Sequence, residues 1–214
     1  LISDSFRNRL RWSIFTRDRL IAVGLEQPPL VKDQFYSTIP TLAIDDFEML
    51  HPQPGIEDAV SDHNIHAESL ALIFIEKTKL CRCIRDCVFS WESREPTPQR
   101  LVIKARRAGL GLVRKELDDW LNEAPESVTF RPNLFQPTNN ADLILYSHCA
   151  WLKIAYLDIY RTVHGQLYLL SDHYSPHKPL SPTFADSPVF SSTAELTGVL
   201  QDLYQKNLIY SLPT

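Results

Sequence analysis

Apolar residues recur every three or four positions along most of this chain, and this period predicts helices. The first such run extends from Arg9 to Gly24 and is ended by Pro28-Pro29. One set of its apolar residues keeps strict helical spacing, and a second set lies on an adjoining stripe: Leu10, Ile14, Ile21 and Leu25 in the first, Trp12, Phe15 and Ala22 in the second. Residues 30–55 have no sustained period, so we expect an extended connection that lies against the helices.

Four further helices are predicted, at about 62–92, 110–122, 140–170 and from the capping-box spacing Ser192-Thr193-Ala194-Glu195 to about 208. Asn139 or Asn140 is expected to cap the fourth helix of the chain, at about 140–170. That helix is apolar nearly all the way round, which is typical of a helix buried on several sides. Residues 127–130 are the only strand candidate. We therefore predict an all-α fold, an irregular multi-helix array around a buried central helix at about 140–170.

The bulk composition is that of an ordinary globular protein, with 214 residues, 44% apolar and 22% charged. We expect one helical domain over residues 1–214, with a Pro/Ser-rich loop at 171–191. The first residue is not Met, and we expect a region of a longer protein. A formal net charge of −4 lacks the electrostatic footprint of a nucleic-acid binder. No apolar run approaches the roughly 20 residues that span a bilayer.

Few residues in the sequence suggest catalysis or metal binding. On one continuous helix, Cys81 would point roughly 160° to 200° away from Cys83 and Cys87, so the three sulfurs would not converge on one ion. His63 and His66 have no ligand in register, and their spacing is typical of surface residues. No serine elbow, phosphate-binding glycine loop or His-Glu-x-x-His motif occurs. We expect neither an enzyme nor a metal or other cofactor in this chain.

Two polar features remain. Asp18 has no basic residue three or four positions away, so if buried it needs a cation from another element. This neighbourhood is either a structural ion pair between helices, with Trp12 and Phe15 buried beside it, or a switch or partner surface. On the central helix, Tyr156, Tyr160 and His164 form a polar aromatic stripe, which either makes internal hydrogen bonds or, with Trp151, lines a pocket for a small effector.

The arginine-rich first helix resembles the signature helix in the middle homology (regulatory) region of fungal zinc-cluster transcription factors, especially those similar to the cutinase transcription factors. The signature is carried by Arg9, Trp12, Arg17, Asp18, Arg19, Gly24 and Pro28. Further segments resemble the same family in the same order: Thr38 to Phe47, Leu117 to Pro125, Trp151 to His164, and Ala194 to Pro213. The chain departs from the family pattern in three places. Arg11 replaces a Trp, Glu26-Gln27-Pro28 replaces Gly-Arg-Pro, and His164-Gly165-Gln166-Leu167 replaces His-Arg-Pro-Phe.

The resemblance implies a regulatory domain that does not touch DNA and that modulates transcription by RNA polymerase II in the nucleus. Its partners would be proteins of the transcription machinery or a small-molecule effector. The six-cysteine zinc cluster that binds DNA in this family is absent here, so the resemblance places zinc and DNA binding in a separate region on the N-terminal side. A helical scaffold or interaction protein without such a cluster is the alternative, and a helical enzyme with a dispersed His/Asp site is the third hypothesis.

Overall fold

The structure is a computed structural model that describes residues 3–47, 61–89, 99–132, 137, 139–171 and 187–212. Its α-helices are α1 (Asp4–Gly24), α2 (Asp33–Tyr36), α3 (Ser61–Arg82), α4 (Gln99–Glu123), α5 (Asn140–Leu169) and α6 (Pro188–Gln205). Short 3-10 helices are η1 (Ile44–Asp46), η3 (Asp86–Val88), η4 (Glu126–Val128) and η6 (Ile209–Ser211). The described residues contain no strand, and the predicted all-α class is confirmed.

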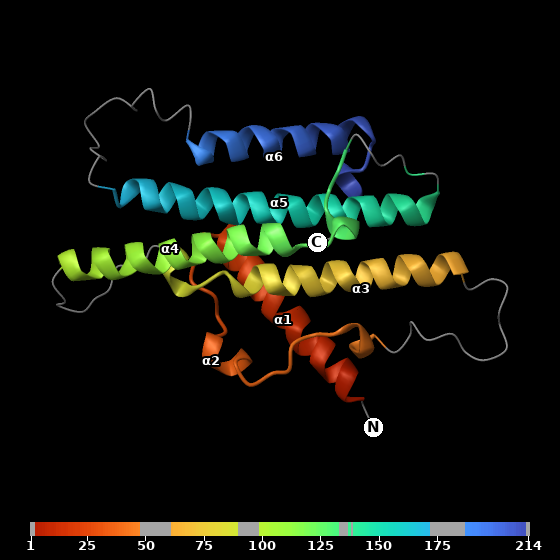
Figure 1. Ribbon diagram of the computed structural model, residues 1–214, viewed down its shortest axis with the longest axis horizontal. Coiled ribbons are helices and arrows are strands. Elements are labelled where there is room, and N and C mark those ends of the chain that lie inside the picture. Colours follow the sequence, from red (N-terminus) through yellow and green to blue (C-terminus); the bar gives the residue numbers. More distant parts are fainter. Residues whose placement is uncertain are drawn as a thin grey trace.

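Helix α5 lies at the centre of the array. It contacts α3, α4 and α6, and Figure 1 shows these four long helices running in nearly one direction while α1 crosses them obliquely. Several of its apolar side chains are almost fully buried: Leu152, Leu157, Ile159 and Val163. A helix that is apolar nearly all the way round needs neighbours on several sides, and α3, α4 and α6 supply them for α5.

Polar side chains fix where three of the helices begin. Ser3 accepts a hydrogen bond from the N–H of Phe6 at the start of α1, and Ser187 accepts one from Phe190 at the start of α6. Asn139 accepts one from the N–H of Asp142, so the predicted cap of α5 is confirmed. Each cap satisfies a backbone donor that the first helical turn leaves free.

The predicted ends of two helices were wrong. Helix α3 ends at Arg82 rather than near residue 92, and Ile84 and Val88, expected on its buried face, lie after it in a turn and in η3. Both remain fully buried, which explains why their spacing resembled a continuing helix. Helix α4 starts at Gln99, well before the predicted Leu110.

The last helix also begins earlier than predicted. Ser192, expected to cap it, is buried inside α6, where its hydroxyl donates to the carbonyl of Val189. The helix starts at Pro188, a residue that favours the first turn because no partner is needed there for its missing N–H. The expected loop at 171–191 is therefore shorter at its C-terminal end, and residues 172–186 lie outside the described part.

The strand candidate at 127–130 was wrong, because its first two residues belong to η4. Its apolar members are nevertheless buried, since Val128 and Phe130 pack into the core beside α5. No helix in the described ranges is both long enough and apolar enough to cross a membrane.

Candidate functional site

The buried face of α1 holds the segment 28–47 through polar contacts. Trp12 is only 2% exposed, and its indole N–H donates to the carbonyl of Pro40 at 2.8 Å. Phe15 is buried beside it with the rings in edge-to-face contact, as the sequence predicted. Nearer the start of the helix, the amide of Asn8 donates to the carboxylate of Asp46 at 3.1 Å.

Among the residues that the structure describes, Asp18 pairs with no cation, and that prediction was wrong. Its carboxylate accepts the backbone N–H groups of Leu30 at 2.9 Å and Val31 at 3.1 Å. The ion pair belongs instead to its neighbour Arg19, whose guanidinium donates to Asp33 on α2 at 2.5 Å and to the carbonyl of Val31 at 3.0 Å. Adjacent residues on a helix point about 100° apart, so the two side chains hold the segment from different sides.

Trp12, Asp18 and Arg19, with the groups that they bind, are called the α1 clamp below. Arg19 is 0% exposed, and two of its nitrogens, Nε and Nη1, have no hydrogen-bond partner among the described residues. Its guanidinium carbon lies 5.0 Å from the centroid of the Phe15 ring, a cation–π distance. Burial, and secondly the charge of Asp18, raises the pKa of nearby Tyr36. The clamp thus buries a charge that is costly to leave unpaired.

The other residues of the family signature take no part in the clamp. The Arg9 guanidinium lies over the rings of Phe6 and Phe47, at 5.9 and 5.6 Å. Arg17 and Pro28 are exposed. Gly24 ends α1, and a Cβ built there would meet no atom within 4 Å. The structure therefore gives no steric reason for glycine at position 24.

The aromatic stripe of α5 packs against α4. Tyr156 is buried with its ring stacked on Trp120 at a centroid distance of 5.5 Å, and Tyr160 follows at 5.6 Å. Tyr160 in turn packs on His164 at 4.2 Å. Trp151, proposed with them, instead lies under the ammonium of Lys77 from α3, 4.3 Å from its ring centroid. The structure brings together three of the four predicted effector residues and leaves Trp151 apart.

His164 is the member of this set that lines an open pocket. The pocket has a volume of about 330 Å³ and is shared with Arg114, Tyr168 and Ser187, the cap of α6. The Nε2 atom of His164 is buried and has no partner among the described residues. Burial, with the positive charge of Arg114, lowers the pKa of this imidazole, so the ring is neutral at physiological pH.

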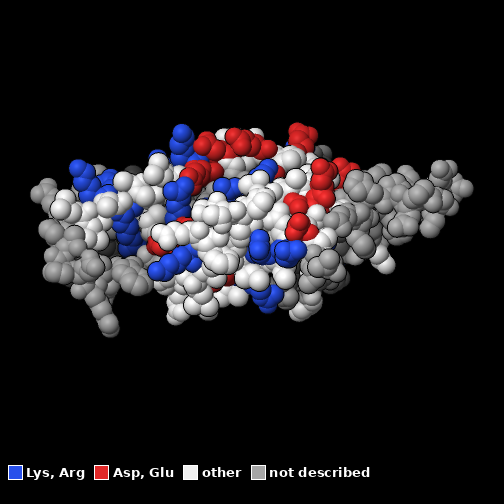
Figure 2. Space-filling view, turned by 90° about the horizontal axis from the view of Figure 1, so that it is seen from below, with Lys and Arg blue, Asp and Glu red and all other residues white. Residues whose placement is uncertain are grey.

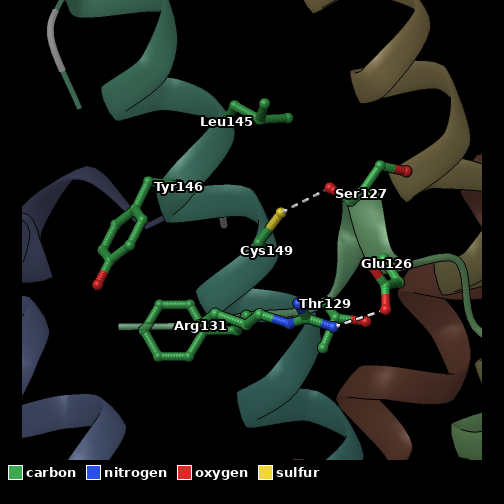
Figure 3. A pocket seen from close by; sticks show the side chains of 8 residues that line it. Glu126, Ser127, Thr129, Arg131, Leu145, Tyr146 and Cys149 are labelled. Atoms are coloured by element: carbon green, nitrogen blue, oxygen red, sulfur yellow. Dashed lines mark hydrogen bonds and ion pairs between the residues drawn. The ribbon is translucent and has the colours of Figure 1, made fainter. Parts of the chain in front are cut away.

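A second pocket, of about 290 Å³, lies between α5 and the segment 126–131. Figure 3 shows Cys149 facing Ser127 across it, while Arg131 and Glu126 form an ion pair at one side. Tyr146 also lines the pocket, and its hydroxyl donates to Asp202 of α6 at 2.5 Å. Sequence reasoning missed this site, because nothing in the local pattern shows that residues 126–131 fold back onto α5.

Three of the four cysteines are buried and Cys87 is half-buried. Burial raises the thiol pKa of Cys81, Cys83 and Cys149 to about 12 in each case. Cys83 and Cys87 lie beyond the end of α3, so the helix-face argument made from the sequence does not apply to them. No group of three potential ligands able to hold a metal ion occurs among the described residues.

The histidine pair predicted at the start of α3 is only partly described. His66 lies 2.8 Å from the carboxylate of Asp142 and so links α3 to α5, rather than standing free on the surface. The side chain of His63 lies outside the described residues. On α5, Asp158 and Arg161 form an ion pair at 2.8 Å.

Comparison with known proteins gives two relatives. The chain is 29% identical over 171 residues to the transcription factor cpaR of Aspergillus oryzae, and the match covers 75% of this chain and 28% of that protein. It is 35% identical over 88 residues to cutinase transcription factor 1 beta of Fusarium vanettenii, covering 36% of this chain and 9% of the relative. No protein-family model and no solved structure matches. The chain thus spans less than a third of either relative, and the resemblance to fungal transcription factors indicated by its motifs is confirmed.

Proposed function

We propose that this chain is the regulatory part of a fungal transcription factor and that it acts in the nucleus without contacting DNA itself. The observation that carries the proposal is the match to two transcription factors by a chain that has only four cysteines, all buried or half-buried. A six-cysteine zinc cluster needs six thiols, and this chain has only four. The net charge of −4 also opposes binding to phosphates. DNA binding and zinc are therefore assigned to another region of the protein.

In this proposal the α1 clamp is the element through which regulation works. The position of segment 28–47 is tied to α1 by Asp18 and Arg19, and α1 in turn packs on α3. A partner or effector changes activity only if it favours one of two packings of such elements. Because Arg19 is buried beneath the segment, any movement of the segment would have to break or rebuild its bonds.

Placing the chain between a heterologous DNA-binding domain and an activation domain tests this proposal. We expect insertion to change reporter output several-fold, and Arg19→Ala to abolish that change at equal protein level, because the variant loses the bonds of Arg19 to Val31 and Asp33 and loosens the clamp. Lys104→Ala, an exposed position on α4, is the matched control and should behave as wild type. Reporter output that is indifferent to insertion and to both variants would overturn the proposal.

The effector part of the proposal concerns His164. A ligand that carries a hydrogen-bonding group for the buried Nε2 and a carboxylate for Arg114 would satisfy both groups. We expect at least one acid in a panel of small carboxylates to raise the thermal midpoint of the wild-type chain, and His164→Phe to remove the shift. Shifts of equal size in both proteins would contradict this site.

A further inference from the structure

The outer face of α1 carries a row of exposed apolar side chains. Phe6, Leu10, Ile14, Ile21 and Leu25, called the α1 stripe below, are each between 46% and 63% exposed. They lie at helical spacing along one face, over a length of about 28 Å at 1.5 Å per residue. A contiguous exposed apolar patch of this kind marks an interaction surface more often than isolated exposed side chains do.

The α1 clamp keeps the stripe facing outward. Trp12 and Arg19 project from the opposite side of the helix, and their bonds to Pro40, Val31 and Asp33 fix which face is buried. Turning the stripe inward would expose the tryptophan and strip the arginine of its partners. Leu30, 93% exposed, adds to the stripe, because its N–H binds Asp18, one turn from both Ile14 and Ile21.

Positive charge lies within the stripe and along one side of it. With about 100° per residue, Arg17 falls on the line of the stripe between Ile14 and Ile21, and Arg11 projects to one side of it. Both are exposed, and among the described residues no carboxylate forms an ion pair with either. Arg17 also lies close enough to Lys77 to lower the pKa of that ammonium, in addition to the larger effect of burial and against the opposing effect of Cys81.

Figure 2 views the molecule from the side on which α1 begins. Lys and Arg atoms lie in separate groups around an uncharged area, whereas Asp and Glu gather toward one edge. The face is therefore neither uniformly acidic nor uniformly basic.

We propose that the α1 stripe is the docking surface for an acidic amphipathic helix of a partner protein. A helix laid along α1 would pair its own apolar row with the stripe, with one acidic residue within that row opposite Arg17 and another at its edge opposite Arg11. Because the stripe is straight and runs along a helix, it fits a helical partner. The two arginines without an ion-pair partner among the described residues favour an acidic one.

A second copy of this chain fits the surface poorly. Two stripes facing each other would bring together the unpaired Arg11 and Arg17 of both copies, and like charges across an interface oppose association. An acidic partner would instead place a carboxylate against each of the two arginines, so that the stripe makes two favourable ion pairs. The inference deepens the proposed function, on which it rests for the biological role of the surface but not for its chemistry.

Two designed 20-residue peptides test the surface directly. Both carry leucines at helical spacing; one has Glu within the leucine row and along one side of it, and the other has Lys at the same positions. We expect fluorescence anisotropy to show that the 214-residue chain binds the Glu peptide at least tenfold more tightly than the Lys peptide, with affinity falling as salt rises. Ile14→Glu should weaken binding of the Glu peptide about tenfold, equivalent to 1.4 kcal/mol.

The double variant R11E/R17E should reverse the preference in favour of the Lys peptide. Leu112→Glu is the control, since Leu112 is equally exposed, at 56%, but lies on α4. Equal binding of both peptides, an effect of the control as large as that of Ile14→Glu, or a dimer of the chain that Ile14→Glu dissociates would each overturn the proposal. Because the peptides are tested without DNA or reporter, this result is independent of the insertion experiment.

Discussion

At the scale of one residue, Glu26 shows how this chain departs from the family signature. It has a φ of 54°, in the left-handed region, just beyond the C-cap of α1. Its N–H binds the carbonyl of Val23 and the N–H of Gln27 binds that of Ala22, the two bonds of a Schellman motif. The residue at this point of the motif is usually glycine, and in the family pattern it is the glycine of Gly-Arg-Pro. Position 26, rather than Gly24, is where backbone geometry favours glycine.

Glu26→Gly should stabilise the chain by about 1 kcal/mol, because glycine adopts the left-handed conformation without the clash of a Cβ. Urea denaturation at pH 7 measures the change. Glu26→Ala is the matched control: it removes the same carboxylate but keeps the Cβ, so its stability should stay near that of wild type. Equal gains in both variants would mean that the charge of Glu26, not its backbone, is unfavourable.

Residues of the α1 clamp illustrate what the sequence could and could not predict. The burial of Trp12 follows from its size and position, and that prediction was correct. The partners of Asp18 and Arg19 did not follow, because both lie in a segment more than ten residues away whose course has no periodic signal. A cation was expected for Asp18 because the sequence shows which side chains are charged, but not which backbone N–H groups lie near a carboxylate.

At the scale of elements, α6 depends on α5 for its place in the fold. The two helices lie side by side in Figure 1, and Tyr146 of α5 binds Asp202 of α6, which also receives an ion pair from Lys206. Leu203 is the central apolar contact on α6 and is 0% exposed, whereas Leu200, one turn earlier, is 37% exposed. Leu203 is therefore a core residue of α6, whereas Leu200 on the same helix is a surface residue.

Leu203→Ala should destabilise the chain by about 3 kcal/mol, the cost of lost burial and a residual cavity. Leu200→Ala should cost less than about 1 kcal/mol, since the exposed leucine leaves no cavity. Chemical denaturation followed by circular dichroism compares the two. A small effect of Leu203→Ala would mean that α6 unfolds separately from the rest and is not part of the same cooperative unit.

The existence of five long helices was predictable, but most of their ends and the polar residues on the buried face of α1 were not. Periodicity identified the helical run of Leu10, Ile14 and Ile21, yet the structure buries the opposite face, which contains Asn8, Thr16 and Arg19. Asn8 and Arg19 are held inside by bonds to the distant segment 28–47, and Thr16 donates to the carbonyl of Ser13 on its own helix. Hydrophobic spacing alone therefore favours the wrong face wherever a helix buries hydrogen-bonded polar residues and leaves an apolar row exposed.

At the scale of the whole molecule, the buried thiols make the stability of the fold depend on pH. Cys81 on α3, Cys83 in the turn after it and Cys149 on α5 are all buried in one core. Burial raises each thiol pKa to about 12, and for Cys149 it is the only cause. In an unfolded chain these thiols ionise near pH 8.5. Unfolding above that pH therefore releases protons, and the folded state loses stability as the pH rises toward 12.

We expect the free energy of unfolding, measured by urea denaturation under reducing conditions, to be nearly constant from pH 7 to 8 and to fall above pH 9. Each thiol that stays protonated in the fold contributes a slope of roughly 1.4 kcal/mol per pH unit. Cys149→Ala should be less stable than wild type at pH 7, because it loses a buried sulfur, yet its stability should fall less steeply above pH 9. Curves that run parallel through pH 10.5 would show that Cys149 ionises in the folded state as readily as in the unfolded one. Its environment between α5 and Ser127 would then be open to water, and the pocket drawn in Figure 3 would extend to the sulfur.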